Sequence, residues 1–198
     1  MTARAPVQAA GGWKEQLRRV AELALLGIVA VPASLPVVTV GAVVATLSSA
    51  VGHWVDHDEL PSYREIGTEF ARRLLPGVPV SAAGVLAVLV VVQQVDWLRA
   101  GVVPGGGAVL AVFGVAVACL VAVVLLAVPR LAGGGWRTAL AAAWTDLLRA
   151  PASGLAALAV TGVAALLAVL LPGVVLVLPA LVVLALHAVH RRLVPPRP

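Results

Sequence analysis

Residues 26–54 read LGIVAVPASLPVVTVGAVVATLSSAVGHW, and this stretch decides the topology of the chain. As one helix, the apolar run over 20–51 would be about 48 Å long, whereas a bilayer core is about 30 Å thick. Pro32 and Pro36 both interrupt a helix, because proline lacks a backbone N–H and clashes with the preceding turn. The stretch therefore predicts two short helical segments, 20–34 and 37–52. They either cross the membrane twice or form a re-entrant hairpin.

The composition of the whole chain is that of a membrane protein. Of its 198 residues, 61% are hydrophobic and 12% are charged, and the mean hydropathy is +1.04. Soluble domains are about 45–50% apolar and about 25% charged. The composition excludes a water-soluble fold and predicts an all-α, polytopic helical bundle in contact with the lipid bilayer. The length allows one membrane domain, 1–198, and the predominance of Arg, Ala, Val and Gly suggests a bacterial genome rich in GC.

Apolar runs further along the chain predict two more hairpins. The three hairpins cover about 20–52, 78–128 and 152–190, and cytoplasmic connectors span 52–77 and 129–151. Pro172 and Gly173 are expected to form the turn of the third hairpin, since proline cannot continue a helix and glycine tolerates positive φ.

The distribution of basic residues sets the orientation of the hairpins. If the first hairpin returns to its starting side, thirteen of the fourteen Arg and Lys residues lie on one face of the membrane. A single crossing of 20–51 would divide them five against nine. Because cytoplasmic loops are enriched in Arg and Lys, we expect a multi-pass protein of the cell membrane with both termini cytoplasmic. The same distribution explains the net charge of +5 by topology, with no need for nucleic acid as a partner.

Each predicted hairpin follows an amphipathic stretch that carries an aromatic residue. These stretches are WKEQLRRVAELA (13–24), REIGTEFARRLL (64–75) and WRTALAAAWTDLLR (136–149). Helices of this kind either lie flat in the membrane interface or present one face to a partner. For the partner interpretation, we expect the surface to consist of Phe70 with the charges that border it. Those charges are Glu69, Arg72 and Arg73.

Small residues recur along the segment 37–52. Gly41, Ala45 and Ser49 are spaced by four, which lets helix backbones approach closely in lipid. The segment is therefore expected to be buried among the other helices. Thr39 is expected to cap the helix that begins at Val40, although an exposed helix N-terminus could also contact a ligand.

Three blocks of this chain resemble the YesL family of bacterial membrane proteins. The sharpest is LPVVTVGAVVATL (35–47), in which Pro36, Thr39, Gly41, Ala45 and Leu47 stand at the places of the family pattern, with Thr46 where Ala is more usual. The second is YREIGTEFARRLLPG (63–77), with a Phe on an amphipathic helix. The third is LAVPRLAGGGWRTALAAAWTDLLRAP (126–151). The family often has Asn and Lys after the second block, where this chain has Leu, Leu, Pro and Gly.

The resemblance covers nearly the whole chain and implies a role rather than a chemistry. Members often accompany ABC-type carbohydrate uptake systems, so the resemblance implies a non-catalytic accessory protein whose partner is an importer permease or its ATP-binding subunit. It implies no catalytic residues. The alternative from a different class is a small oligomeric channel or facilitator for a small solute. An intramembrane enzyme is the third interpretation and finds no support in the residues.

Candidate chemistry is sparse. His53 and His57 are one helical turn apart near Asp56, a spacing that suits a metal, but a third ligand is missing and a solvated acidic loop is the favoured interpretation. No metal or cofactor is expected. Gln93, Gln94 and Asp96 end one predicted span and are candidates for solute contact. No predicted span has a central charged residue, and no hydroxyl has a neighbouring base, so neither a proton-coupled pump nor nucleophilic catalysis is indicated.

Overall fold

The computed structural model describes residues 13–34, 36–57, 61–100 and 106–193, and these residues contain seven α-helices, three 3-10 helices and no strand. The predicted all-α class is confirmed. The α-helices are α1 (Trp13–Ala33), α2 (Val40–His57), α3 (Tyr63–Arg99), α4 (Gly106–Ala127), α5 (Trp136–Arg149), α6 (Pro151–Leu170) and α7 (Leu178–Leu193). The 3-10 helices are η1 (Val37–Thr39), η2 (Val128–Ala132) and η3 (Pro172–Leu176).

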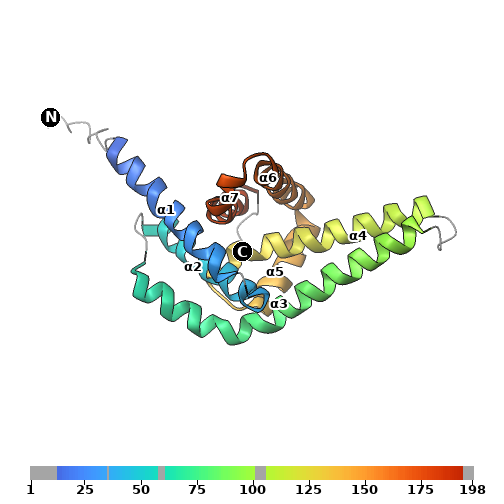
Figure 1. Ribbon diagram of the computed structural model, residues 1–198, viewed down its shortest axis with the longest axis horizontal. Helices are drawn as coiled ribbons and strands as arrows, with labels where there is room; N and C mark the ends of the chain where they lie inside the picture. The colour runs from blue at the N-terminus through green and yellow to red at the C-terminus, as the bar shows by residue number, and fades with distance from the viewer. Residues whose placement is uncertain (1–12, 35, 58–60, 101–105, 194–198) are drawn as a thin grey trace.

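Helix α2 is the most buried of the long apolar helices and lies beside α1 and α3 (Figure 1). It packs against α1, α3, α7 and η2, and 56% of its most apolar window is buried, against 11–17% for the other long apolar helices. Its side chains Leu47 and Val51 belong to one core with Leu126 and Leu131. The expectation that 37–52 is buried among the other helices is confirmed for 41–52, where small residues let neighbouring helices approach closely, whereas Val37, Val38 and Val40 are exposed.

The chain breaks between α1 and α2 where the two prolines predict it. Helix α1 ends at Ala33, one residue after Pro32, and the single turn η1 follows Pro36. The Thr39 hydroxyl donates toward the carbonyls of Ala33 and Pro36, the latter at 2.7 Å. Thr39 therefore stabilises the turn through carbonyls, and it does not make the side-chain cap expected at the start of α2.

Two of the three amphipathic stretches are continuous with the apolar segments that follow them, where separate helices were expected. Residues 13–24 and the short apolar segment 20–33 form the single helix α1. Helix α3 runs for 37 residues through Pro76 and Pro79, and Figure 1 shows it curving along its length. Proline bends a helix without ending it when packing holds both sides together, as it does in membrane helices. The third stretch does form a separate helix, α5.

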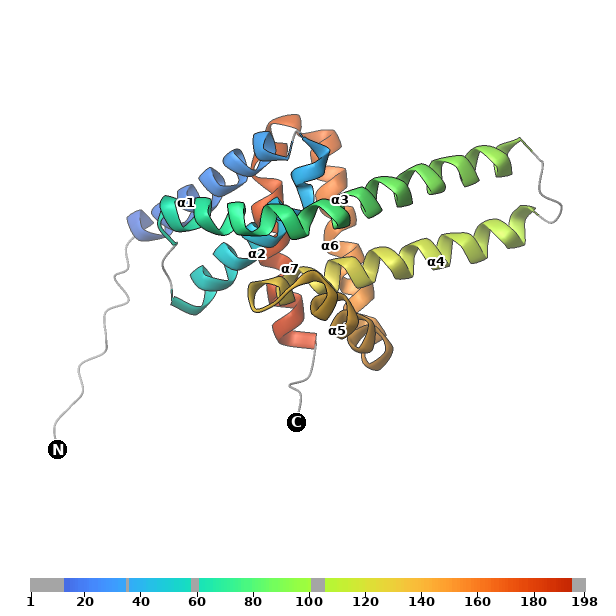
Figure 2. The same ribbon diagram turned by 90° about the horizontal axis from the view of Figure 1, so that it is seen from below.

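Four helical segments are long and apolar enough to cross a membrane: Val37–His57, Tyr63–Trp97, Gly107–Ala132 and Pro151–Leu170. They suggest a multi-pass protein in contact with lipid. The second half of α3 and the first half of α4 project together, away from the body that the other helices form (Figure 2). The helices therefore do not all lie inside one bundle. Apolar side chains such as Leu86, Leu89, Val112 and Val115 are exposed along this projection. Lipid is the solvent that suits such a surface.

In the last third of the chain, an ion pair joins η2 to α5, and a turn joins α6 to α7. Arg130 of η2 forms an ion pair with Asp146 of α5, whose side chain is 3% exposed. After α6, the turn from Leu171 to Val177 contains η3, so the predicted turn at Pro172 and Gly173 is observed with an additional 3-10 segment.

Candidate functional site

The candidate site is held in place by a close crossing of α2 and α3. Gly41 and Gly77 face each other: a Cβ on Gly41 would lie 2.6 Å from the Gly77 carbonyl oxygen, and a Cβ on Gly77 would lie 2.6 Å from the Ala42 nitrogen. The Gly41 N–H donates to the Ser81 hydroxyl at 2.8 Å, and that hydroxyl donates to the Gly77 carbonyl at 3.1 Å. The first N–H groups of a helix have no partner within the helix. Ser81 of α3 thus caps α2 from outside.

The start of α3 is fixed by a capping box. The Ser62 N–H donates to Glu65 Oε2 at 2.9 Å, and the Glu65 N–H donates to the Ser62 hydroxyl at 3.3 Å. This reciprocal arrangement satisfies two backbone donors at a helix N-terminus. The spacing Ser-x-x-Glu in SYRE (62–65) is the sequence signal for this capping box.

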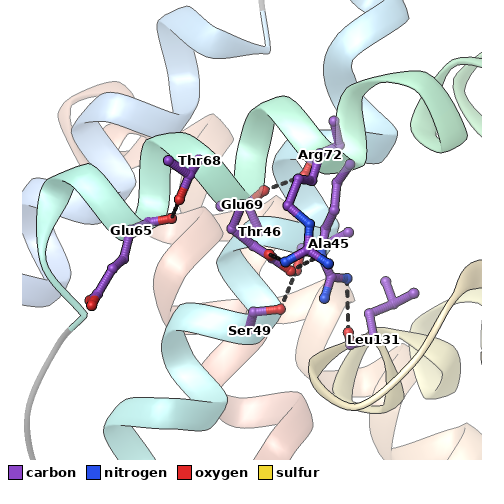
Figure 3. A network of polar contacts seen from close by, with 10 residues as sticks. Ala45, Thr46, Ser49, Glu65, Thr68, Glu69, Arg72 and Leu131 are labelled. Atoms are coloured by element: carbon purple, nitrogen blue, oxygen red, sulfur yellow. Dashed lines mark hydrogen bonds and ion pairs between the residues drawn. The ribbon is translucent and has the colours of Figure 1, made fainter.

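A polar cavity of about 570 Å³ lies between the C-terminal half of α2 and the first three turns of α3. Figure 3 shows Thr46 and Ser49 of α2 facing Glu69 and Arg72 of α3 across it. The Thr46 and Ser49 hydroxyls donate to carbonyls of their own helix, those of Ala42 and Ala45, at 2.9 and 3.2 Å. Their lone pairs remain able to accept a hydrogen bond.

The charges along this part of α3 differ in how far the protein itself engages them. Arg73 donates to Glu69 Oε1 at 2.5 Å and to the Leu131 carbonyl of η2 at 2.8 Å, and its side chain is only 18% exposed. Arg72 contacts Glu69 Oε2 at 3.5 Å and is 82% exposed. At the other end of the cavity, Asp56 pairs with Arg191 of α7. Of the adjacent residues Arg72 and Arg73, Arg72 is therefore the one that points out of the fold.

An apolar cavity of about 350 Å³ adjoins the polar one. It lies between α1, α2 and α3 and is bounded by side chains such as Leu26, Val29 and Phe70. Thr46 and Ile66 line both cavities. A third cavity, about 300 Å³ and lined by Arg18 and Glu22 of α1, also reaches Ile66. The three hollows therefore meet around one side chain of α3.

The residues expected to form a partner surface do not share one exposed face. Phe70 is half-buried and packs against the core, and Glu69 and Arg73 are engaged with each other and with η2. Among these four residues, Arg72 is exposed.

The other expected site residues lie apart from the cavities. Gln93, Gln94 and Asp96 belong to the projecting half of α3, about six turns beyond Arg72. Pro36 is exposed beside η1, and Ala45 is buried on α2, where it lines a small cavity of about 220 Å³ together with Arg73 and Trp136. Gly173 is exposed in the turn after α6. These positions place Ala45 next to the candidate site and the remaining residues away from it.

The histidine pair lies on a helix, so the favoured loop interpretation is wrong for residues 53–57. Helix α2 continues to His57, and the His53 and His57 rings stack with centroids 4.3 Å apart. Within the described part of the chain, no three His, Cys, Asp or Glu side chains gather as a metal site would require. The neighbouring acidic residues Asp58 and Glu59 lie outside the described residues.

No protein-family model, curated protein or solved structure matches this chain. The resemblance to the YesL family therefore stays a prediction. What the geometry supplies is an arrangement for binding: exposed donors on α3 and α2, hydroxyl acceptors on α2, and an apolar hollow beside them.

Proposed function

We propose that this protein is a non-catalytic, multi-pass accessory protein of the cell membrane that docks a transport complex through the start of α3. The observation that carries the proposal is an exposed stripe on that helix. Arg64, Thr68, Arg72 and Leu75 recur at helical spacing and are all exposed, while Phe70 on the other side packs inward. An amphipathic helix that has buried one face and keeps a basic and apolar stripe outside is suited to a partner.

The proposed topology puts this stripe in the cytoplasm. Thirteen of the fourteen Arg and Lys residues fall on that side if α1 and α2 form a returning hairpin, with both termini cytoplasmic. The start of α3, η2 and α5 then lie at the cytoplasmic face. A partner there would be a permease loop or an ATP-binding subunit, and the resemblance to the YesL family favours a carbohydrate importer of the ABC type.

Arg72 and Arg73 differ in how many contacts they make within the fold, and this difference decides which residues a test should change. Reversing Arg73 would break its contacts with Glu69 and Leu131, and a loss of binding could then reflect a loss of folding. Arg64 and Arg72 are exposed, so Arg64→Glu with Arg72→Glu alters the docking stripe without breaking the contact between α3 and η2. The matched control reverses two exposed arginines of α5, Arg137 and Arg149.

The experiment is co-purification of the tagged chain with a co-expressed carbohydrate importer of the ABC type. We expect the α3 double variant to lose the transporter at unchanged membrane yield and the α5 double variant to retain it. If both variants retain the transporter, the stripe is not the docking surface. If wild type captures no transporter, the accessory role fails, and swelling of liposomes that contain the purified protein then tests the facilitator alternative.

A further inference from the structure

The apolar and polar cavities form one amphipathic hollow rather than two unrelated ones. They share Thr46 and Ile66, and their volumes, about 350 and 570 Å³, fall within the range of about 300–1,000 Å³ that is usual for small-molecule sites. Side chains of α1, α2 and α3 that bound the first are almost entirely hydrocarbon. Those that bound the second include histidines, hydroxyls and charged groups. A ligand that fills both must have an apolar part and a polar part.

The polar half has its carboxylates satisfied from within the protein. Asp56 pairs with Arg191, Glu69 accepts from Arg73, and Glu65 accepts the Ser62 N–H. Among the other groups that line the cavity, Arg72 makes one long contact with Glu69, at 3.5 Å, and its side chain stays 82% exposed, while the rings of His53 and His57 are also exposed. The planar donor fork of arginine matches the oxygens of a phosphate group. The polar half is therefore suited to an acidic headgroup.

We propose that the joined cavities bind one glycerophospholipid with an acidic headgroup. An acyl chain occupies the apolar cavity between α1, α2 and α3, and the phosphate lies beside Arg72 in the polar cavity. The order of the two halves agrees with a lipid in a leaflet. The apolar cavity lies against residues 25–33 of α1 and reaches α2 at residues 43–47, whereas the polar one extends along α2 to its end at His57.

Glycine at position 67 provides a test that does not depend on damaging the fold. Gly67 lines the apolar cavity, and a Cβ placed there would meet nothing within 4 Å. Gly67→Leu puts a side chain into the space of the acyl chain and also improves the helix propensity of α3. Gly84→Leu is the matched control, since Gly84 lies on the same helix, is equally open and is not among the residues that line either cavity. For the headgroup, Arg72→Gln is compared with Arg137→Gln on α5.

The measurement is native mass spectrometry of the delipidated, purified chain, titrated with dioleoylphosphatidylglycerol, dioleoylphosphatidylcholine or glycerol 1-phosphate. We expect wild type and Gly84→Leu to retain one phosphatidylglycerol and Gly67→Leu to retain none. Arg72→Gln should weaken that binding at least about tenfold, as expected for a lost charge-assisted hydrogen bond, and Arg137→Gln should not.

Three results would overturn the proposal. Equal lipid retention by Gly67→Leu and Gly84→Leu would show that the apolar cavity holds no acyl chain. Equal affinity for the two phospholipids would show that the site does not select an acidic headgroup. If glycerol 1-phosphate binds as tightly as the lipid, the site binds a phosphate group without using the acyl chain. The readout uses the purified chain without any transporter, so its outcome is independent of the proposed docking function.

Discussion

The close crossing of α2 and α3 makes the most quantitative prediction about this protein. Gly41→Ala adds a methyl group whose carbon would lie 2.6 Å from the Gly77 carbonyl oxygen and 3.1 Å from the Ser81 hydroxyl. The nearer atom belongs to the backbone, so the two helices must move apart. That movement also stretches the 2.8 Å hydrogen bond from the Gly41 N–H to Ser81, which caps α2.

The expected cost follows from these two effects and one that opposes them. Overpacking of a well-packed interface costs about 1–3 kcal/mol, and weakening one hydrogen bond adds about 1 kcal/mol. Replacing glycine by alanine inside a helix returns up to about 1 kcal/mol. Gly41→Ala should therefore lower the free energy of unfolding by about 1–3 kcal/mol, and Gly41→Leu by more. At Gly114 on α4 an added Cβ meets nothing within 4 Å, so the same changes there should be neutral or slightly stabilising.

The assay is thermal unfolding in detergent, followed by the monodisperse fraction on size exclusion. Gly41→Leu should lose folded protein at a clearly lower temperature than Gly114→Leu, with the alanine variants in the same order. Ser81→Ala is a companion, since it removes the cap without adding volume and should lower stability by about 1–3 kcal/mol. Equal melting temperatures for the position 41 and position 114 variants would refute the close approach of α2 and α3.

Two further predictions concern the end of the chain and its orientation. Asp146→Asn should destabilise the protein by about 3–5 kcal/mol, because it leaves the guanidinium of Arg130 without its buried counter-charge. The combined change Arg130→Met/Asp146→Leu should cost much less. Similar melting temperatures for the two variants would contradict a buried ion pair. In a Cys119→Ser background, Ser62→Cys should react only with reagents that reach the cytoplasm and Gly173→Cys with an impermeant reagent in intact cells. External labelling at position 62 would reverse the proposed orientation.

The sequence was informative where one residue type has one structural consequence. Pro32 and Pro36 predicted the break between α1 and α2, and Pro172 with Gly173 predicted the turn before α7, because proline cannot donate into a helix. The stripe of small residues that includes Gly41 predicted the burial of α2.

The sequence was less informative where a local signal competes with tertiary packing. The amphipathic stretch 64–75 and the hairpin from residue 78 were expected as separate elements, but α3 continues through Pro76 and Pro79, and Gly77 between them packs against α2. The cap of α2 could not be read locally either. The expected capping residue was the adjacent Thr39, whereas the hydroxyl that accepts from the Gly41 N–H is that of Ser81, forty positions further along the chain.

The candidate site shows the same difference for charged residues. Arg72 and Arg73 are adjacent and equally basic, and the sequence alone assigned both to a partner surface. Consecutive residues of a helix point about 100° apart. Arg73 therefore faces η2 and donates to the Leu131 carbonyl, while Arg72 faces the polar cavity and solvent. The consequence is that substitutions at the two positions should affect different properties. A change at Arg73 acts on the fold, and a change at Arg72 acts on what the protein binds.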